Sequence, residues 1–289
     1  MSNYNSKQRD SKNADFKHGD SNHRARKRFG QNFLHDQHVI ARIVKAITPR
    51  EGQMLVEIGP GKGAITEPLL DACSELTVIE IDRDLAAMLT SRFADKPGFR
   101  LVEQDVLEFD FATLNAPAAS LRILGNLPYN ISTPLLFHLL QYHELIADMV
   151  FMLQLEVVNR LAAQPGDPDY GRLSIMMQYY CKVEKLFKVP ATAFVPQPKV
   201  ESAIVKLTPW RELPYPATNI VTFTNVVRTA FNQRRKTIRN TLKNLLSNEQ
   251  LESLELDLSL RPENLSIEDY VRITAILDRH SEVSRASEQ

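Results

Sequence analysis

The sequence has few cysteines, no metal-ligand spacing and no long apolar run. Its two cysteines, Cys73 and Cys181, lie far apart in 289 residues, which gives neither a disulfide framework nor a cysteine metal site. His35, His38 and His138 show no ligand spacing with cysteine or acidic partners, so no metal is expected. No apolar run approaches the ~18–20 residues of a membrane span, and the N-terminal stretch is polar. We therefore expect a cytoplasmic protein with no membrane partner.

The net charge is zero, but the charges are unevenly distributed. Residues 1–28 hold eight Lys/Arg against three Asp/Glu. The polar segment 1–23 cannot bury enough apolar surface to fold, so we expect a disordered, solvated tail there. The closing basic run 24–28 abuts the first motif of the chain and is expected to contact phosphate.

A glycine-rich loop follows the first strand-like run. Residues 54–58 are mostly apolar and of strand length, residues 59–63 read Gly-Pro-Gly-Lys-Gly, and residues 64–70 have the pattern of a helix start. A strand, a glycine loop and a helix in this order are typical of a nucleotide-cofactor turn. Because Gly59, Gly61 and Gly63 alternate, the dinucleotide pattern G-x-G-x-x-G does not fit, and a pyrophosphate is disfavoured.

Three acidic residues end or follow the next two strand-like runs. Glu80 lies about 20 residues beyond the glycine loop, where a carboxylate typically accepts hydrogen bonds from ribose hydroxyls, so an adenosyl cofactor without phosphates fits best. Asp82 is interpreted as the N-cap of a helix that begins near Arg83. Asp105 either accepts the adenine amino group of that cofactor or caps the next turn, and the sequence does not choose between the two.

The four residues Asn126-Leu127-Pro128-Tyr129 suit the methylation of an amino group on a flat ring. The exocyclic nitrogen of adenine is a poor nucleophile, so a site that methylates it must hold its two N–H groups with two acceptors. The Asn126 side chain and a Pro128 carbonyl freed from the strand ladder can be these acceptors. Tyr129 offers a face on which an extruded base can stack. An ordinary turn is the simpler alternative for these four residues taken alone.

The pattern of the whole chain predicts an α/β fold with a doubly wound, mostly parallel sheet. The chain is long enough to bury such a core and to form a second small domain. We expect a catalytic domain over residues 24–209 and a small helical domain over 210–289. Two further strands are expected to form an antiparallel hairpin at the sheet edge. The seven expected strands are 54–59, 76–82, 99–105, 121–125, 148–154, 181–189 and 201–208.

Several motifs in the right order resemble the ribosomal RNA adenine dimethyltransferase family, in particular its bacterial small-subunit branch, whose loss gives kasugamycin resistance. The resemblance runs from about Arg24 to near residue 280. Its motifs are Phe29-Gly30-Gln31-Asn32-Phe33-Leu34, Glu57-Ile58-Gly59-Pro60-Gly61, Glu80, Asp105, Gly125-Asn126-Leu127-Pro128-Tyr129, Phe194-Val195-Pro196-Gln197-Pro198-Lys199-Val200 and Phe231-Asn232-Gln233-Arg234-Arg235-Lys236-Thr237.

The resemblance implies a Rossmann-like, S-adenosylmethionine-dependent methyltransferase with a small C-terminal all-α domain. It implies dimethylation of two adjacent adenines in a hairpin loop near the 3′ end of 16S rRNA, within an immature small ribosomal subunit, by what we expect to be a monomer. Cofactor contacts are expected at Asn32, Leu34, Gly59, Gly61, Glu80, Asp105 and Asn126. The catalytic set is expected to comprise Asn126, Leu127, Pro128, Tyr129 and Phe194.

Phe194 sits among prolines that stiffen its loop, and two interpretations compete for it. A lone phenylalanine is normally a buried anchor. The resemblance favours a ring that stacks on the target base opposite Tyr129.

The segment between Glu212 and Glu249 has no acidic residue and is strongly basic. If it forms one helix, Arg235, Arg239 and Lys243 make a row beside an apolar face and could meet an RNA backbone. Whether residues 228–246 form one helix or two is left open by the sequence. A merely solvated surface is the simpler alternative. The RNA-binding residues are expected to be Arg234, Arg235, Lys236, Arg239 and Lys243.

Three alternative functions remain at this stage. They are a large-subunit rRNA or DNA adenine methyltransferase, an RNA-binding ribosome assembly factor whose catalysis is secondary, and a transcription factor derived from the same fold. The basic run from Phe231 and the leucine in Asn-Leu-Pro-Tyr argue against the first.

Overall fold

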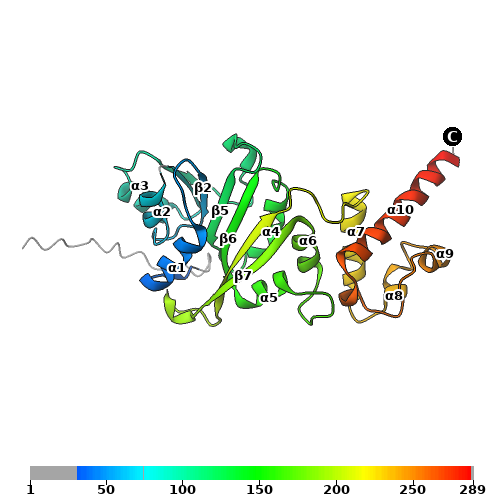
Figure 1. Ribbon diagram of the computed structural model, residues 1–289. Coiled ribbons are helices and arrows are strands. Elements are labelled where there is room, and N and C mark those ends of the chain that lie inside the picture. The colour runs from blue at the N-terminus through cyan, green and yellow to red at the C-terminus, as the bar shows by residue number, and fades with distance from the viewer. Residues whose placement is uncertain (1–30, 74, 288–289) are drawn as a thin grey trace, which may run out of the picture.

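The computed structural model describes residues 31–73 and 75–287, with side-chain burial described as far as residue 279 (Figure 1). The predictions of a disordered tail over 1–23 and of phosphate contact by 24–28 lie outside the described residues. No helix within the described part of the chain is long and apolar enough to cross a membrane.

A seven-stranded sheet in the order β4-β3-β2-β5-β6-β9-β7 forms the centre of the α/β part. The first five of these strands are parallel, and β9 runs antiparallel to both β6 and β7. The seven expected strands are therefore confirmed, including the antiparallel pair at the edge. Their bounds are β2 Met54–Ile58, β3 Leu76–Glu80, β4 Phe99–Glu103, β5 Leu121–Asn126, β6 Ile146–Gln154, β7 Cys181–Val189 and β9 Ser202–Pro209.

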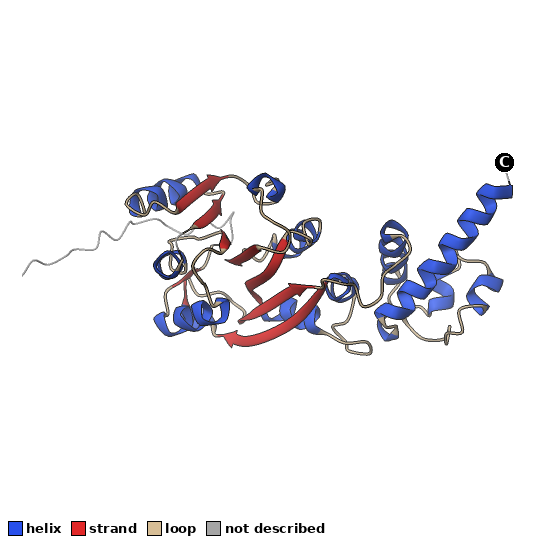
Figure 2. Cartoon of the chain, turned by 45° about the horizontal axis from the view of Figure 1, so that its top comes forward, coloured by secondary structure: helices blue, strands red, loops and turns tan. Residues whose placement is uncertain are grey.

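Helices cover both faces of the sheet, so the strands are apolar on both sides (Figure 2). In β2, Val56 and Ile58 pack into the core under α4, α5 and α6, while Leu55 packs into the core under α1 and α2. This two-sided burial explains why the strands appear in the sequence as short continuous apolar runs. The helices are α1 Gln37–Ile47, α2 Thr66–Ala72, α3 Arg83–Arg92, α4 Ser132–Leu140, α5 Leu155–Ala162 and α6 Arg172–Tyr180, with 3₁₀ turns η2 Phe111–Leu114 and η3 Ala191–Ala193.

A second, two-stranded ribbon joins distant parts of the chain. Its strands are β1 Phe33–Leu34 and β8 Phe194–Val195, which pair antiparallel with Leu34 opposite Phe194. The amide of His35 extends the pairing by donating to the carbonyl of Ala193 at 3.0 Å. This β1–β8 ribbon holds the residues that precede α1 against the loop that leads into β9.

The C-terminal part is helical and lies at one end of the molecule (Figures 1 and 2). It comprises α7 Ile220–Asn232, α8 Ile238–Leu242, α9 Asn248–Glu252, the 3₁₀ turn η4 Pro262–Asn264 and α10 Ile267–Ser287. Its core is continuous with that of the sheet, because Phe223, Ile238 and Tyr270 belong to the same buried cluster as the residues under α4 to α6.

The basic segment forms two helices, so a single row of basic residues on one helix is not present. Arg235 lies in the turn between α7 and α8. The break is stabilised at the start of α8, where the amide of Ile238 donates to the carbonyl of Leu260 at 2.8 Å and that of Arg239 to Leu258 at 3.2 Å. These bonds pair amide groups that a helix start leaves without intrahelical partners.

Candidate active site

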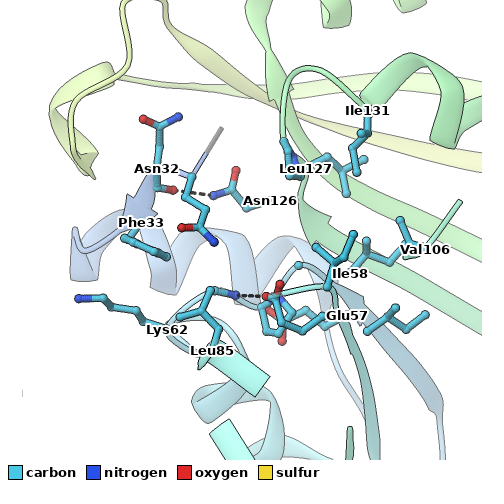
Figure 3. Close-up of a pocket in the computed structure, with 18 of the residues that line it drawn as sticks. Asn32, Phe33, Glu57, Ile58, Lys62, Leu85, Val106, Asn126, Leu127 and Ile131 are labelled. Carbon is cyan, nitrogen blue, oxygen red and sulfur yellow. Dashed lines mark hydrogen bonds between the residues drawn. The ribbon is translucent and has the colours of Figure 1, made fainter. Parts of the chain in front are cut away.

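A cavity of about 250 Å³ opens at the carboxyl ends of β2, β3 and β5, where doubly wound sheets bind their ligands (Figure 3). The structure brings together in its wall every residue that the sequence proposed for the cofactor and four of the five proposed for catalysis. These are Asn32, Leu34, Gly59, Gly61, Glu80, Asp105, Asn126, Leu127, Pro128 and Tyr129.

The glycine loop depends on backbone conformations that favour glycine. Gly61 has φ +59°, and a Cβ there would stand 3.2 Å from the ring of Phe33. The Phe33 ring thus covers the loop closely, with the Lys62 ammonium 5.2 Å from the ring centroid. A larger residue at position 61 would strain the backbone and push Phe33 away from the cavity wall.

Glu80 is nearly buried at the end of β3 and is held by the backbone. Its Oε1 accepts from the amide of Asp82 at 2.9 Å, and its Oε2 accepts from the amide of Gly61 at 3.4 Å. Burial raises the pKa of the Glu80 carboxyl, and these two hydrogen bonds partly offset the rise. The carboxylate therefore joins the glycine loop to β3 and keeps further lone pairs for donors in the cavity.

Glu57 is a site residue for which the sequence predicts no role, although it begins the motif Glu57-Ile58-Gly59-Pro60-Gly61. It lies in the cavity wall, is 2% exposed, and its Oε2 accepts from the Thr66 hydroxyl at 2.6 Å. Burial raises its pKa to about 7, with the nearby Glu80 charge adding to the rise and the Thr66 hydrogen bond opposing it. Within the described residues, neither Glu57 nor Glu80 forms an ion pair.

Asp82 and Asp105 both act as caps, and Asp105 also reaches the cavity. The Oδ1 of Asp82 accepts from the amide of Asp84 at 3.1 Å, so Asp82 is the N-cap of α3, as predicted. The Oδ1 of Asp105 accepts from the amide of Leu107 at 2.9 Å. Asp105 also lines the cavity, so its capping role and its proposed cofactor role are geometrically compatible.

The side-chain amide of Asn126 is oriented by the segment before β1. Its Nδ2 donates to the backbone carbonyl of Asn32 at 3.2 Å (Figure 3). A carbonyl can only accept, so this contact requires the NH₂ group of Asn126 and directs the side-chain oxygen elsewhere. Asn126 Oδ1 is thus available as an acceptor at the cavity.

The next three residues differ in how they are held. Leu127 is 1% exposed and donates its amide to the carbonyl of Met152 at 3.2 Å, so its side chain anchors the loop in the core. The Pro128 carbonyl lies outside the strand ladder, as predicted, but accepts from the amide of Ile131 at 3.2 Å; its second lone pair remains for a further donor. The Tyr129 hydroxyl is 3.1 Å from Ser202 Oγ, which fixes its ring.

Gly125 explains why the strand can carry Asn126 so close to the glycine loop. A Cβ on Gly125 would stand 2.4 Å from the carbonyl oxygen of Ile58 in the neighbouring strand. That distance is too short for any side chain, so β5 and β2 approach as closely as they do only with glycine here.

Phe194 is placed apart from the other predicted catalytic residues. It is 2% exposed, lies opposite Leu34 in the β1–β8 ribbon, and packs in the core under α1 and α2. Phe194 does not line the cavity in the part of the chain that the structure describes. The buried-anchor interpretation describes this arrangement, and stacking on a target base stays a prediction that requires the ring to move.

The five predicted RNA-binding residues are exposed on the C-terminal helical part, but they differ in their neighbours. Arg239 lies 3.9 Å from Glu252, and Arg234 lies 3.9 Å from Glu263. The segment between Glu212 and Glu249 has no acidic residue, but the fold brings Glu252 and Glu263 to it from farther along the chain. Arg235, Lys236 and Lys243 have no side-chain hydrogen bond or ion pair within the described residues.

The cavity also contains apolar residues that the sequence reasoning missed. Ile81 follows Glu80, and Val106 follows Asp105, so each lies directly after a strand-end acid. An apolar residue in that position is a usable signal, because a flat heterocyclic ring in such a cavity needs apolar surface against its faces as well as polar groups at its edges. Ile81 is 47% exposed at the cavity wall.

The sheet order, the glycine loop and the strand-end acids around one cavity define the α/β methyltransferase fold. The chain belongs to the ribosomal RNA adenine dimethylase family, whose model matches residues 22–279. It is therefore an S-adenosylmethionine-dependent rRNA adenine dimethyltransferase.

Proteins of known name are similar in sequence over most of the chain. The chain is 56% identical over 258 residues to a ribosomal RNA small subunit methyltransferase A of Hahella chejuensis, covering 89% of this chain and 94% of that protein. It is 59% identical over 251 residues to the protein of the same name from Pseudomonas aeruginosa, covering 87% and 94%.

Two solved structures at 26% identity are also similar. One is a dimethyladenosine transferase from Plasmodium falciparum, with a TM-score of 0.74 over 86% of this chain and 98% of that one. The other is the 23S rRNA methyltransferase ErmE, with a TM-score of 0.66 over 86% and 100%.

Proposed function

We propose that the protein dimethylates the N6 amino groups of two adjacent adenines in the 3′-terminal hairpin loop of 16S rRNA, within an immature small ribosomal subunit. The names of the relatives from Hahella chejuensis and Pseudomonas aeruginosa support a small-subunit substrate. The observation that supports the chemistry is the orientation of Asn126, whose Nδ2 is bound to Asn32 so that its Oδ1 can accept from an amino group. We further propose that the protein acts in the cytoplasm as a monomer.

Asn126 Oδ1 and the carbonyl of Pro128 accept from the two N–H groups of the target adenine. This contact draws the nitrogen toward a tetrahedral geometry and holds it in line with the methyl group. S-adenosylmethionine, when bound, supplies a methyl group whose departure leaves a neutral thioether. The adenine nitrogen loses one N–H proton to solvent during or after each transfer. Because Pro128 already accepts from Ile131, its remaining lone pair serves the substrate.

The cavity fits this cofactor in charge and shape. Glu80 binds the ribose hydroxyls, Asp105 binds the adenine amino group, and the backbone at Gly59 and Gly61 allows close approach. Asn32 and Leu34 close the cavity from the side of the β1–β8 ribbon.

The target base leaves its stack before reaction, at a cost of a few kcal/mol that is smallest in a loop. Tyr129 gives the extruded base a fixed aromatic face, since its hydroxyl lies against Ser202. Phe194 takes the opposite face only if its ring moves out of the core. A hairpin loop is thus a sensible substrate for this site.

We propose that residues 24–209 form the catalytic domain, with 1–23 as a polar tail, and that 210–289 form an RNA-binding domain. Arg235, Lys236 and Lys243 are exposed there and have no acidic partner among the residues that the structure describes, which suits them to phosphate contact. Arg239 forms an ion pair with the exposed Glu252. An exposed ion pair contributes little to stability, so a phosphate of the RNA could replace Glu252.

Changing Arg235, Lys236 and Lys243 together to Gln tests this surface. Each phosphate contact that is lost should flatten the slope of log affinity against log salt by somewhat under ~1 unit. Filter binding to small subunits at several salt concentrations measures the slope. An unchanged slope would identify the surface as ordinary solvated residues and leave the RNA contact to be found elsewhere.

The main experiment is transfer of a tritiated methyl group to purified small subunits that lack the modification. Label at two adjacent adenines of the small-subunit RNA supports the proposal. Absence of label with tight binding retained supports an assembly factor instead, and label in large-subunit RNA supports the other methyltransferase class.

A further inference from the structure

Arg234 is held at the junction between the sheet part and the helical part, although the sequence groups it with Arg235 and Lys236. Its guanidinium Nη2 donates to the carbonyl of Pro168, in the loop 163–171 that connects α5 to α6. Its Nε lies 3.9 Å from Glu263 Oε2, in η4 of the helical part. One side chain therefore contacts a loop of the sheet part and a carboxylate of the helical part.

Glu263 has features of a residue that needs this cation. Its side chain is 18% exposed, and its Oε2 is buried without a hydrogen-bond partner in the described part of the chain. A buried carboxylate oxygen is costly unless a positive charge faces it. The Glu263 backbone is fixed to the same loop, because its carbonyl accepts from the amide of Gly166 at 2.7 Å.

The rest of the loop 163–171 is embedded in the shared core. Tyr170 is fully buried and clusters with Tyr270 of α10, and a Cβ on Gly171 would stand 3.9 Å from the Phe231 ring of α7. Burial raises the pKa of the Tyr170 hydroxyl, with the charge of Asp269 adding to the rise. The loop thus meets the helical part through buried aromatic packing on one side and through Arg234 on the other.

We infer that Arg234 is a positioning residue that fixes the helical part relative to the active site, by joining Pro168 to Glu263, and that it does not bind phosphate. Its neighbour Arg235 is exposed and contacts neither Pro168 nor Glu263 among the described contacts. Arg234 therefore holds the two parts together, whereas Arg235 is available to RNA. The inference rests on the proposed function only in that the exposed basic residues of the helical part bind rRNA. It adds that their distance and angle to Asn126 are set by the Arg234 contact.

A positioning residue and a phosphate ligand differ in how salt affects their loss. Removing a phosphate ligand lowers RNA affinity and also flattens its salt dependence, because fewer counterions are released. Removing a residue that holds the two parts in register lowers the affinity while the phosphate contacts, and therefore the slope, remain. Removing Glu263 should then reproduce the loss of Arg234, although Glu263 is an acid that no phosphate would attract.

The experiment uses the full chain with R234Q, E263Q, the double variant and R235Q as the matched control. Affinity for unmethylated small subunits is measured across salt concentrations, together with S-adenosylmethionine affinity and thermal unfolding of the free protein. We expect R234Q and E263Q each to weaken subunit binding about tenfold with the parent slope, and the double variant to be no weaker than either. R235Q should flatten the slope. Cofactor affinity should match the parent in all four.

A flattened slope for R234Q equal to that of R235Q, with E263Q binding as tightly as the parent, would overturn the inference. Should R234Q fail to fold, E263Q gives the same comparison of affinity and salt slope with the parent. If the parent shows no salt-dependent subunit binding, the proposed function fails. In that case the thermal unfolding of free R234Q, E263Q and the double variant still tests the contact between the two parts.

Discussion

The two ends of the central sheet both bury carboxylates, but they do so with opposite electrostatics. At the carboxyl ends of the parallel strands, Glu57 and Glu80 are buried without an ion pair among the described residues, and the pKa of each is raised. At the opposite end, Asp148 in β6 is buried against Arg122 in β5 and Lys206 in β9. Burial alone would raise the pKa of Asp148, yet its hydrogen bonds and ion pairs to these two cations bring it below its usual value.

At this opposite end, which we call the closed end, the Arg122 guanidinium supplies hydrogen bonds to most of the nearby acceptors. It donates to both oxygens of Asp148, at 2.8 and 2.9 Å, to the carbonyl of Ile47 at 2.6 Å and to Gln53 Oε1 at 2.7 Å. Both carboxylate oxygens of Asp148 and the guanidinium of Arg122 therefore have partners within the protein. At the carboxyl ends of the strands, which we call the open end, Glu57 and Glu80 lie beside a cavity and form no ion pair with any described residue, so they remain available to a ligand. The comparison teaches that the same residue type is structural where the protein neutralises it and available for binding where the protein does not.

The largest expected effect is at the closed end. Arg122→Met leaves Asp148 buried with only Lys206 and should lower the free energy of unfolding by about 3–5 kcal/mol. Urea denaturation measures this value. Replacing both partners, as Arg122→Met with Asp148→Leu, should restore much of the loss. A single variant as stable as the parent would show that the two ends are not electrostatically different.

At the open end, Asn126→Ala should lower the methylation rate by roughly 10²-fold, because it removes one preorganised acceptor at the reacting nitrogen. Subunit binding should hardly change. Single-turnover methyl transfer measures the rate, with Asn159→Ala in α5 as control, because Asn159 is half-buried but does not line the cavity. A rate near that of the parent would make Asn126 a structural residue.

The pH dependence of stability should have opposite signs at the two ends. The Glu57 carboxyl is protonated in both states below about pH 4.5, and between there and about pH 7 only the unfolded chain loses the proton, so the free energy of unfolding falls as pH rises. Glu57→Gln should therefore gain stability over the parent through this window, by on the order of 2–3 kcal/mol. Asp148, whose pKa is lowered, contributes stability that is lost only as pH falls below its unfolded value.

Urea denaturation of Glu57→Gln and Asp148→Asn at pH 5, 6 and 7.5 separates these cases. The difference between the first variant and the parent should grow with pH. The second variant should be destabilised at all three values. Parallel curves for Glu57→Gln and the parent would show that Glu57 is ionised in the folded protein.

The smallest effect is expected from Glu80→Ala, which should weaken S-adenosylmethionine binding by about 1–3 kcal/mol, since it removes a charged acceptor from ribose hydroxyls. Calorimetry on the free protein gives the dissociation constant. Glu80→Gln keeps the shape and one acceptor, so it should lose less. An unaltered dissociation constant in the Ala variant would remove Glu80 from the cofactor site.

The strands and the cavity wall could be predicted because their signals are local. The apolar runs give the strands. The end of β3 differs from the expected one for a local reason: β3 stops at Glu80, two residues earlier, since Asp82 is already the cap of α3. The glycines and the acidic residues after the strands predict the cavity, because binding a cofactor there requires those residue types. A role for Glu57 cannot be predicted in this way, since nothing in the sequence shows that its carboxyl is buried against Thr66.

The environments of Phe194 and Arg234 could not be predicted, because each depends on a segment far away in the chain. Phe194 is buried by pairing with Leu34, and Arg234 is engaged by Pro168 and Glu263. No spacing rule connects such positions. The break between α7 and α8 cannot be predicted for a related reason, since the carbonyls that stabilise it come from Leu258 and Leu260.

The β1–β8 ribbon has a consequence for the order in which the protein is made. Val195, which pairs with Phe33, lies about two-thirds of the way along the 289 residues. During synthesis the glycine loop, Glu80 and Asn126 all leave the ribosome before the partner of β1 exists. The segment that carries Asn32 is fixed only after the chain has grown past Val195. The hydrogen bond that orients the Asn126 amide can therefore form only late in translation.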